Sequence, residues 1–255
     1  MSRFIDKLKK VGQITSQPMG FAQRATRGAR NANMLVVGVM TSPDHRLAET
    51  AAKSGVDAVA LTLTGQVGKD VLTTLTNSLG DVPLGCNIST SGDTEEDSPD
   101  IDFGIISDIK IPASQIQDID KGTILTIDTT WADSFIRSVD LMPIDAFLID
   151  LSDKDTLTLE LAINCQRVGL LSQKPIIAYV QPSLGAEALT ALRDVGIKAL
   201  AVDVAESSKN GMLDQLCESA HSLEPRKRKT ERRDALVPAM TRGVAPHDEE
   251  DDDDD

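Results

Sequence analysis

Three aspartates stand where short apolar runs of the chain end, and carboxylates in such places can do acid–base or metal chemistry. Asp128 follows "TILTI", Asp150 ends "AFLID" and Asp203 ends "ALAVD". Carboxylates that converge on a dry cavity repel one another, so they need a cation or raised pKa values. Mg²⁺ and Mn²⁺ favour oxygen ligands, which makes Asp150 and Asp203 the metal candidates. The alternative is that the aspartates cap the helices that follow them, as "DTTWADS" and "DLSDKDT" would allow.

Other polar residues follow apolar runs elsewhere in the chain and are candidates for hydrogen-bonding a substrate. They are Asn87, Ser107, Ser183 and Ser207. The loops "QPSLGAE" (181–187) and "AESSKNGM" (205–212) offer backbone amides that could also cradle an anion such as phosphate. Asp203 and Glu206 lie close to these loops and would oppose a phosphate. The polar side chains and the loop amides together favour an anionic or polar small molecule as the ligand.

The elements that must position these residues are eight short runs rich in Val, Ile, Leu and Ala. The runs cover residues 34–40, 57–63, 83–88, 102–107, 123–128, 146–151, 175–180 and 199–204. They are continuously apolar rather than alternating, which is typical of parallel strands that are covered on both faces. Helical patterns lie between most of them, at residues 43–55, 154–171 and 185–196. Repeated strand–helix alternation predicts an α/β fold, a (β/α)8 barrel over residues 34–224.

A two-strand repeat supports the barrel and gives a register for its strands. The even-numbered runs share the lead-in "VDAVAL" (56–61), "IDFGII" (101–106), "IDAFLI" (144–149) and "IKALAV" (197–202), so the unit is βαβα, repeated four times. In this register Thr62, Ser107, Asp150 and Asp203 occupy the same position. If that position points inward, four polar groups ring the mouth of the barrel; if it points outward, the aspartates cap helices instead.

Two connections depart from the pattern. Residues 89–100 are acidic and rich in Gly, Ser and Pro, and residues 108–122 leave room for only a short helix. We therefore expect stunted third and fourth helices, and a barrel that is open or distorted there.

Residues 172–204 resemble the last two strands of aldolase-type, phosphate-binding TIM barrels. In those barrels a Lys-Pro pair opens one strand, and a short Gly-led phrase opens the next. Here these are Lys174-Pro175 and Gly196-Ile197-Lys198-Ala199, and the phrase recurs as Gly55-Val56-Asp57-Ala58. The resemblance covers the strand–helix body and implies this superfamily of barrels.

The charge is unevenly distributed along the chain. Residues 1–30 carry a net charge of +6, residues 31–224 carry −17 and residues 225–255 carry −3. An acidic body repels phosphate backbones, which argues against a nucleic-acid role for the barrel. The three cysteines are far apart in apolar contexts, which indicates buried reduced thiols and a cytoplasmic protein. No apolar run approaches the length of a membrane span.

The two ends of the chain are predicted to be extended segments outside the barrel, which we call arms. Residues 1–33 begin with a short amphipathic helix and continue as a linker. The helix is expected to cap the domain; the alternative is a weak peripheral contact with an anionic membrane surface. Residues 225–255 are a basic and then acidic tail of the kind that is usually disordered.

Two functions remain open from the sequence. The first is a small-molecule lyase or isomerase that acts at the acidic mouth, with Asp128, Asp150 and Asp203 as catalytic residues and Mg²⁺ or Mn²⁺ as cofactor. The second is a non-catalytic scaffold or interaction module whose charged arms engage a protein partner.

Overall fold

The computed structural model describes residues 2–12, 32–62, 68–88, 101–113, 116, 121–154 and 156–225, without the side chain of Asn210. Most of the predicted linker and most of the predicted tail lie outside these residues, so both remain predictions. No helix in the described ranges is long and apolar enough to cross a membrane.

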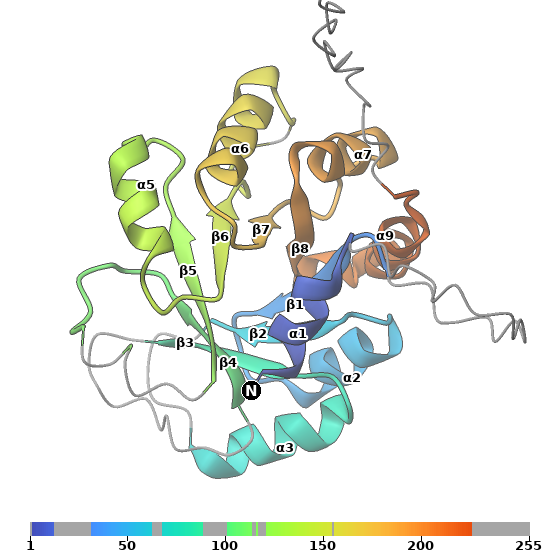
Figure 1. Cartoon of the computed structure of the whole chain (residues 1–255). Coiled ribbons are helices and arrows are strands. Elements are labelled where there is room, and N and C mark those ends of the chain that lie inside the picture. Colours follow the sequence, from blue (N-terminus) through green and yellow to red (C-terminus); the bar gives the residue numbers. More distant parts are fainter. Residues whose placement is uncertain are drawn as a thin grey trace, which may run out of the picture.

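Eight parallel strands close into a barrel in which each strand pairs with the next in the chain and β8 pairs with β1 (Figure 1). The strands are β1 (Leu35–Met40), β2 (Ala58–Leu61), β3 (Leu84–Ile88), β4 (Ile101–Ile106), β5 (Gly122–Ile127), β6 (Ala146–Asp150), β7 (Ile176–Tyr179) and β8 (Ile197–Asp203). Each coincides within a few residues with one predicted apolar run. The prediction of a (β/α)8 barrel is confirmed.

The helices surround the barrel, apart from α1 at one end (Figure 1). They are α1 (Arg3–Lys10), α2 (His45–Lys53), α3 (Lys69–Leu79), α5 (Asp133–Asp140), α6 (Leu159–Leu171), α7 (Ala186–Val195), α8 (Val204–Ser207) and α9 (Met212–Ser222), with a 3-10 turn at Lys209–Gly211. The connection predicted to hold the stunted third helix, residues 89–100, lies outside the described ranges, and so do residues 114–115 and 117–120 of the fourth connection. The expectation of an open barrel is wrong, because β3 and β4 pair along their length. A register shift between Leu84 and Gly85 is the irregularity that remains there.

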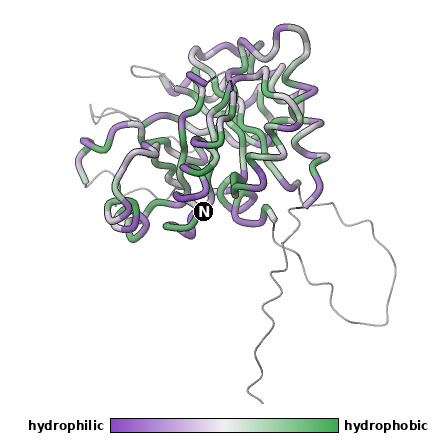
Figure 2. The backbone as a smooth tube through the Cα atoms, turned by 90° about the horizontal axis from the view of Figure 1, so that it is seen from above, coloured by the Kyte–Doolittle hydropathy of each residue, from purple (hydrophilic) through white to green (hydrophobic). Residues whose placement is uncertain are grey.

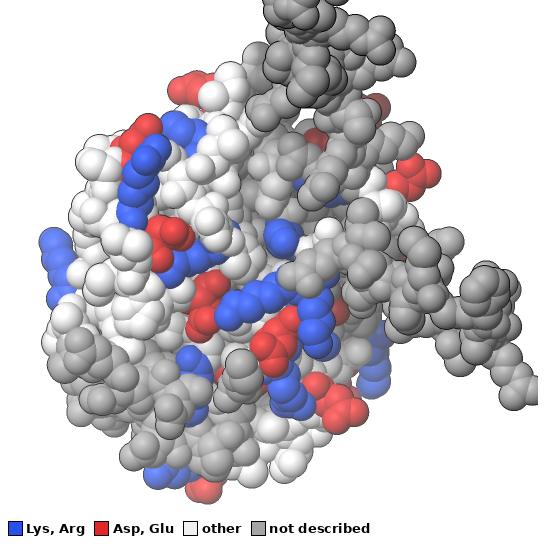
Figure 3. Space-filling model, in the orientation of Figure 1, with Lys and Arg blue, Asp and Glu red and all other residues white. Residues whose placement is uncertain are grey.

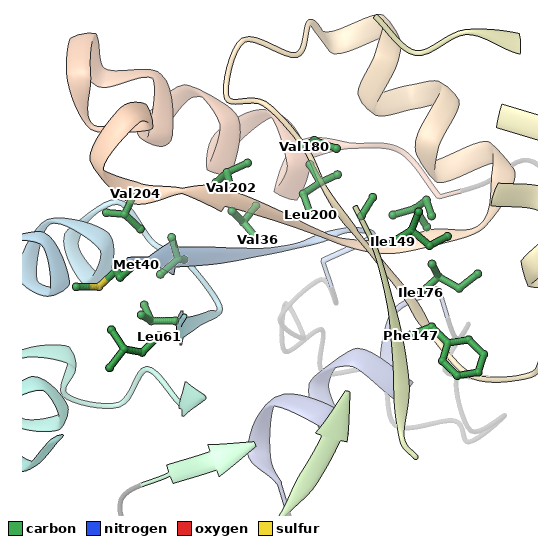
Figure 4. Close-up of a cluster of buried hydrophobic side chains, with 14 of the residues drawn as sticks. Val36, Met40, Leu61, Phe147, Ile149, Ile176, Val180, Leu200, Val202 and Val204 are labelled. Atoms are coloured by element: carbon green, nitrogen blue, oxygen red, sulfur yellow. The ribbon is translucent and has the colours of Figure 1, made fainter. Parts of the chain in front are cut away.

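The apolar side chains form two layers. One layer lies between the strands and the outer helices, and Figure 4 shows part of it, with Val36, Leu200 and Val202 among the labelled residues. The other fills the barrel itself, and in Figure 2 the central strands are correspondingly hydrophobic. The cysteines are buried and unpaired, as predicted. Burial raises the pKa of the Cys86 and Cys165 thiols to about 11 and that of Cys217 to about 12.

The shared lead-in of the even strands has a structural task at the floor of the barrel, the end where the strands begin. Its second residue is polar in all four copies: Asp57, Asp102, Asp145 and Lys198. The side chains of the last three bind α1, which lies across the floor (Figure 1).

Asp102 holds the N-terminus of α1. Its Oδ1 accepts a hydrogen bond from the backbone N–H of Arg3 at 2.8 Å, and its Oδ2 accepts one from Phe4 N–H at 3.0 Å. The hydroxyl of Ser2 donates to the same Oδ2 at 2.7 Å. A helix leaves its first N–H groups without partners and has a positive dipole end there, so a carboxylate is the favourable group at this place.

Two cation contacts fix the other half of α1. Lys198 Nζ donates to the carbonyl of Val11, at the C-terminal end of the helix, at 2.9 Å. Lys9 Nζ donates to Asp145 Oδ1, also at 2.9 Å. A cation at the C-terminus complements the helix dipole as the carboxylate does at the N-terminus. Charges of both signs are interspersed over the face of the molecule that Figure 3 shows.

The apolar face of α1 is inserted into the barrel. Phe4, Ile5 and Leu8 are buried and belong to the same cluster as the strand residues of the interior. The Phe4 and Phe103 ring centroids lie 4.9 Å apart. The helix therefore caps the domain, as expected. The alternative of membrane contact through this apolar face does not fit, because the barrel already covers it.

Candidate active site at the barrel mouth

The polar position that the repeat register singled out lies on the inner face of the barrel. Side chains alternate along a strand, so residues two apart share a face. Ala60, Ile105, Leu148 and Ala201 pack in the cluster inside the barrel. The next residues on that face, at the C-terminal strand ends, are Thr62, Ser107, Asp150 and Asp203.

The odd-numbered strands complete this ring with polar residues of their own. Asn87 lies on the inner face of β3, two positions after Gly85, where an added Cβ would lie 2.1 Å from the Phe103 ring. Asp128 continues the inner face of β5 beyond Thr126, whose Oγ1 is buried without a hydrogen-bond partner among the described residues. A ring of polar groups at the C-terminal end is the place where barrels of this kind carry their active sites.

Each aspartate of the ring commits one carboxylate oxygen to a nearby group. Oδ1 of Asp203 accepts from Glu206 N–H at 2.9 Å, which makes Asp203 the N-cap of α8. Oδ1 of Asp150 accepts from the N–H of Ser152 at 2.9 Å and from its hydroxyl at 2.6 Å. Within the described ranges no hydrogen bond reaches the second oxygen of either carboxylate. Each therefore keeps one oxygen available for a ligand.

The capping alternative is correct for Asp203 alone. Asp128 accepts a hydrogen bond from Thr130 N–H at 2.8 Å, which lowers the pKa of its exposed carboxyl. Helix α5 begins after Ala132, and α6 is capped by the hydroxyl of Thr158. Asp128 and Asp150 thus close turns in the loops that leave β5 and β6, and cap no helix.

Tyr179 is the residue of the mouth that sequence reasoning missed. It ends β7 on the inner face and pairs in register with Asp150 on one side and Ala201 on the other. The pKa of its phenol is raised, because burial disfavours the phenolate and the carboxylates of Asp203, Asp150 and Glu206 repel it. The hydroxyl therefore stays protonated. The available signal was that Tyr179 is the single tyrosine of the chain and stands at a strand end.

The predicted substrate-binding residues separate into two groups. Asn87 and Ser107 come together on neighbouring strands, where the Ser107 hydroxyl donates to Asn87 Oδ1 at 3.0 Å. Ser183 is exposed in the loop before α7. Ser207 is fully buried and its hydroxyl donates to the carbonyl of Asp203, so this hydroxyl is not offered to a substrate. The prediction for Ser207 is corrected, because α8 turns its side chain into the protein.

The structure also bears on the two ligands considered from the sequence. The N-terminus of α8 is occupied by the protein's own carboxylate, Asp203, which argues against a phosphate there. In the part of the chain that the structure describes, no three His, Cys, Asp or Glu side chains are grouped to hold a metal ion. A cation at Asp150 and Asp203 would have to be held by these two carboxylates and water, as Mg²⁺ often is.

The fold is shared with solved enzymes at low sequence identity. Citrate synthase SbnG is 13% identical with a TM-score of 0.56, and the alignment covers 74% of this chain and 94% of that one. A mutant tryptophan synthase α-subunit from the hyperthermophile Pyrococcus furiosus is 10% identical with a TM-score of 0.58, covering 74% and 98%. No protein-family model and no curated protein sequence matches the chain. At these identities the similarity establishes the fold alone: the chain is built as a TIM barrel, the (β/α)8 fold that its sequence predicted.

Proposed function

We propose that this protein is a small-molecule enzyme of the lyase or isomerase type that works at the barrel mouth. The observation that carries the proposal is the meeting of Asp150, Tyr179 and Asp203 on the inner face of three neighbouring strands. Paired acidic and phenolic groups at the C-terminal ends of barrel strands are suited to proton transfer. Two solved structures that share the fold, a citrate synthase and a tryptophan synthase α-subunit, are named for the synthesis of small molecules, which agrees with this proposal.

The roles follow from the state of each group. Asp150 and Asp203 each have one uncommitted carboxylate oxygen, so one of them can accept a proton from a carbon next to a carbonyl. Tyr179 holds its proton and can donate it, or a hydrogen bond, to the oxyanion that develops on the carbonyl. Asn87 and Ser107 orient polar groups of the substrate from the opposite side of the barrel, with Asp128 at the rim.

An anionic substrate would need a cation at this mouth, because Asp150, Asp203 and Glu206 repel it. Mg²⁺ or Mn²⁺ fits the oxygen donors of Asp150 and Asp203, and a bound cation would polarise the substrate's carbonyl. Without a cation the mouth favours a neutral polar substrate.

Deuterium exchange tests the proposed chemistry without knowledge of the natural substrate. The full chain is incubated in D₂O with the anions pyruvate, oxaloacetate and 2-oxoglutarate and with the neutral ketone dihydroxyacetone, with and without Mg²⁺ or Mn²⁺. The loss of C–H signals relative to a protein-free sample is followed by proton NMR. We expect exchange that Tyr179→Phe and Asp150→Asn abolish. Ser138→Ala, a change at an exposed serine of the outer helix α5, serves as the control for the mouth variants.

Thermal denaturation tests the cation separately. We expect Mg²⁺ or Mn²⁺ to raise the Tm of the wild type, and Asp150→Asn with Asp203→Asn to remove this effect. Asp153→Asn, in the same loop as Asp150, should leave it unchanged. A wild type that no cation stabilises rules out the metal, and a wild type that also exchanges no proton rules out the proposed reaction.

A further inference from the structure

Exposed apolar side chains are concentrated on one side of the barrel. The described ranges contain eight large hydrophobic residues that are exposed, and six of them lie on α5 and α6 or directly beside them. We call these six the α5–α6 apolar patch: Phe135, Leu141, Met142, Leu159, Ile163 and Leu170. The other two, Val71 and Ile109, lie on α3 and after β4. The grouping of these six side chains needs an explanation. Single exposed apolar residues are common on protein surfaces, whereas groups of them mark interaction surfaces.

Helix α6 supplies the centre of the patch. Leu159, Ile163 and Leu170 follow one another at helical spacing and are 77%, 56% and 80% exposed. The opposite side of the helix, with Cys165 and Val168, is buried against the barrel. A helix that is apolar on both sides is normally covered on both sides.

Helix α5 extends the patch beside α6 (Figure 1). The two helices are tied by the ion pair of Arg167 with Asp133, and at their C-terminal ends the Ser172 hydroxyl donates to Asp140. Leu141 and Met142 follow α5 at this same end, as Leu170 does on α6. The six side chains together expose several hundred Å² of apolar surface, comparable to the apolar share of one side of a standard interface, which buries ~800 Å² per partner.

The distribution of charge around the patch favours a second copy of this chain as the partner. The body of this protein is acidic, with a net charge of −17 over residues 31–224, so two copies repel each other wherever acidic faces meet. Residues 161–173, on α6 and just after it, contain no acid, and their one charged residue, Arg167, is already paired with Asp133. On α5 the acid Asp133 is paired with Arg167 and Asp140 accepts a hydrogen bond from Ser172, which leaves Glu160 as the one acid of α6. A second copy can therefore approach along α6 with little like-charge repulsion, and both sides of the contact then bury apolar surface.

We propose that two copies of this chain associate through the α5–α6 apolar patch. The two α6 helices pack antiparallel about a two-fold axis near Gln166, which is exposed midway between Ile163 and Leu170. In such an isologous contact each residue of the patch meets the same surface of the second copy. Residues near the axis meet their own equivalents.

The molar mass in solution tests the association. Light scattering and sedimentation of the full chain should give twice the chain mass of 27.4 kDa at micromolar concentrations. Ile163→Glu with Leu170→Glu should give a folded monomer, because these positions are exposed and the carboxylates would face each other across the axis. The matched control is Val71→Glu with Ile109→Glu, which changes the two exposed apolar residues outside the patch and should leave the dimer intact.

A cross-link tests the position of the axis. All three native cysteines are buried, so Gln166→Cys introduces an exposed thiol that is alone among the described residues. Mild oxidation should join two copies through position 166 and should not do so through Glu187→Cys on α7. A dimer that fails to cross-link overturns the axis near Gln166. A wild type that remains at 27.4 kDa overturns the whole proposal, whether the patch is then bare or covered by residues 226–255 of the same chain.

Discussion

The carboxylate of Asp102 accepts a 3.0 Å hydrogen bond from the backbone N–H of Phe4, across 98 positions of the chain. This bond joins the start of β4 to the first turn of α1 and helps to close the floor of the barrel. Asp102→Ala removes three acceptor contacts from the start of the helix and should destabilise the fold by about 2 kcal/mol. Thermal denaturation should show a Tm lowered by roughly 4–8 °C. Asp81→Ala, at an exposed aspartate nearby, should leave the Tm within error of the wild type; equal losses in the two variants would contradict the anchoring role.

Ile5 tests how much the inserted face of α1 contributes. Its side chain is 3% exposed, and its Cγ1 would lie only 2.4 Å from a Cβ added to Gly122. Ile5→Ala leaves a cavity in the barrel floor and should cost about 2–5 kcal/mol in unfolding free energy, measured with urea. Ile109→Ala makes the same change at a side chain that is 50% exposed and should cost much less. If the two losses match, α1 is not part of the core.

Gly85 is required by the ring of Phe103. An added Cβ would lie 2.1 Å from that ring, so Gly85→Ala should destabilise the barrel by about 1–3 kcal/mol. The smaller side chain of Phe103→Leu should make the alanine less costly than it is in the wild-type background, which a double-mutant cycle measures. Gly169→Ala, inside α6, is the control, because the nearest atom to its added Cβ lies 3.6 Å away at ordinary contact distance. A Gly85→Ala variant as stable as this control would exclude the steric argument.

His221 gives helix α9 a pH-dependent attachment to the barrel. Its Nε2 lies 2.9 Å from Asp57 Oδ2, which also accepts from the N–H of Val36. The hydrogen bond to Asp57 raises the pKa of the imidazole, against the opposing effects of burial and of Lys7. A raised folded-state pKa means that the stabilisation is fully present below the unfolded pKa of about 6.5 and is lost as pH rises through the folded value.

Urea unfolding at several pH values measures this contribution. The stability difference between the wild type and His221→Gln should be larger near pH 5.5 than near pH 8.5, with the unfolded pKa of about 6.5 between them. Asp57→Asn retains an acceptor for Val36 N–H and should remove the same pH dependence. A difference that stays constant with pH would show that the imidazole is not charged by this contact.

Much of the fold was accessible from local sequence, for a physical reason. Strands that are covered on both faces must be apolar along their whole length. The continuously apolar runs "PIIAYV" (175–180) and "ALAVDV" (199–204) therefore predicted buried parallel strands. The two-strand repeat fixed which residues share a face, because side chains alternate with a period of two. This register put Asp150 and Asp203 at one repeat position, and the packing of Leu148 and Ala201 in the structure shows that this position lies on the inner face of the strands.

Only the tertiary structure decided which residues meet. Strand pairing places Tyr179 of β7 between Asp150 on β6 and Asp203 on β8. No local sequence pattern encodes which strands become neighbours. The turn after Asp203 carried Ser207 into the interior, although its type and position suited a substrate ligand. The lead-in phrase looked like a strand signal, yet the structure uses the side chains of Asp102 and Lys198 to hold a helix from the start of the chain. Sequence thus determined the strands and their faces, whereas barrel closure and the docking of α1 determined the contacts, because both depend on residues that only folding brings together.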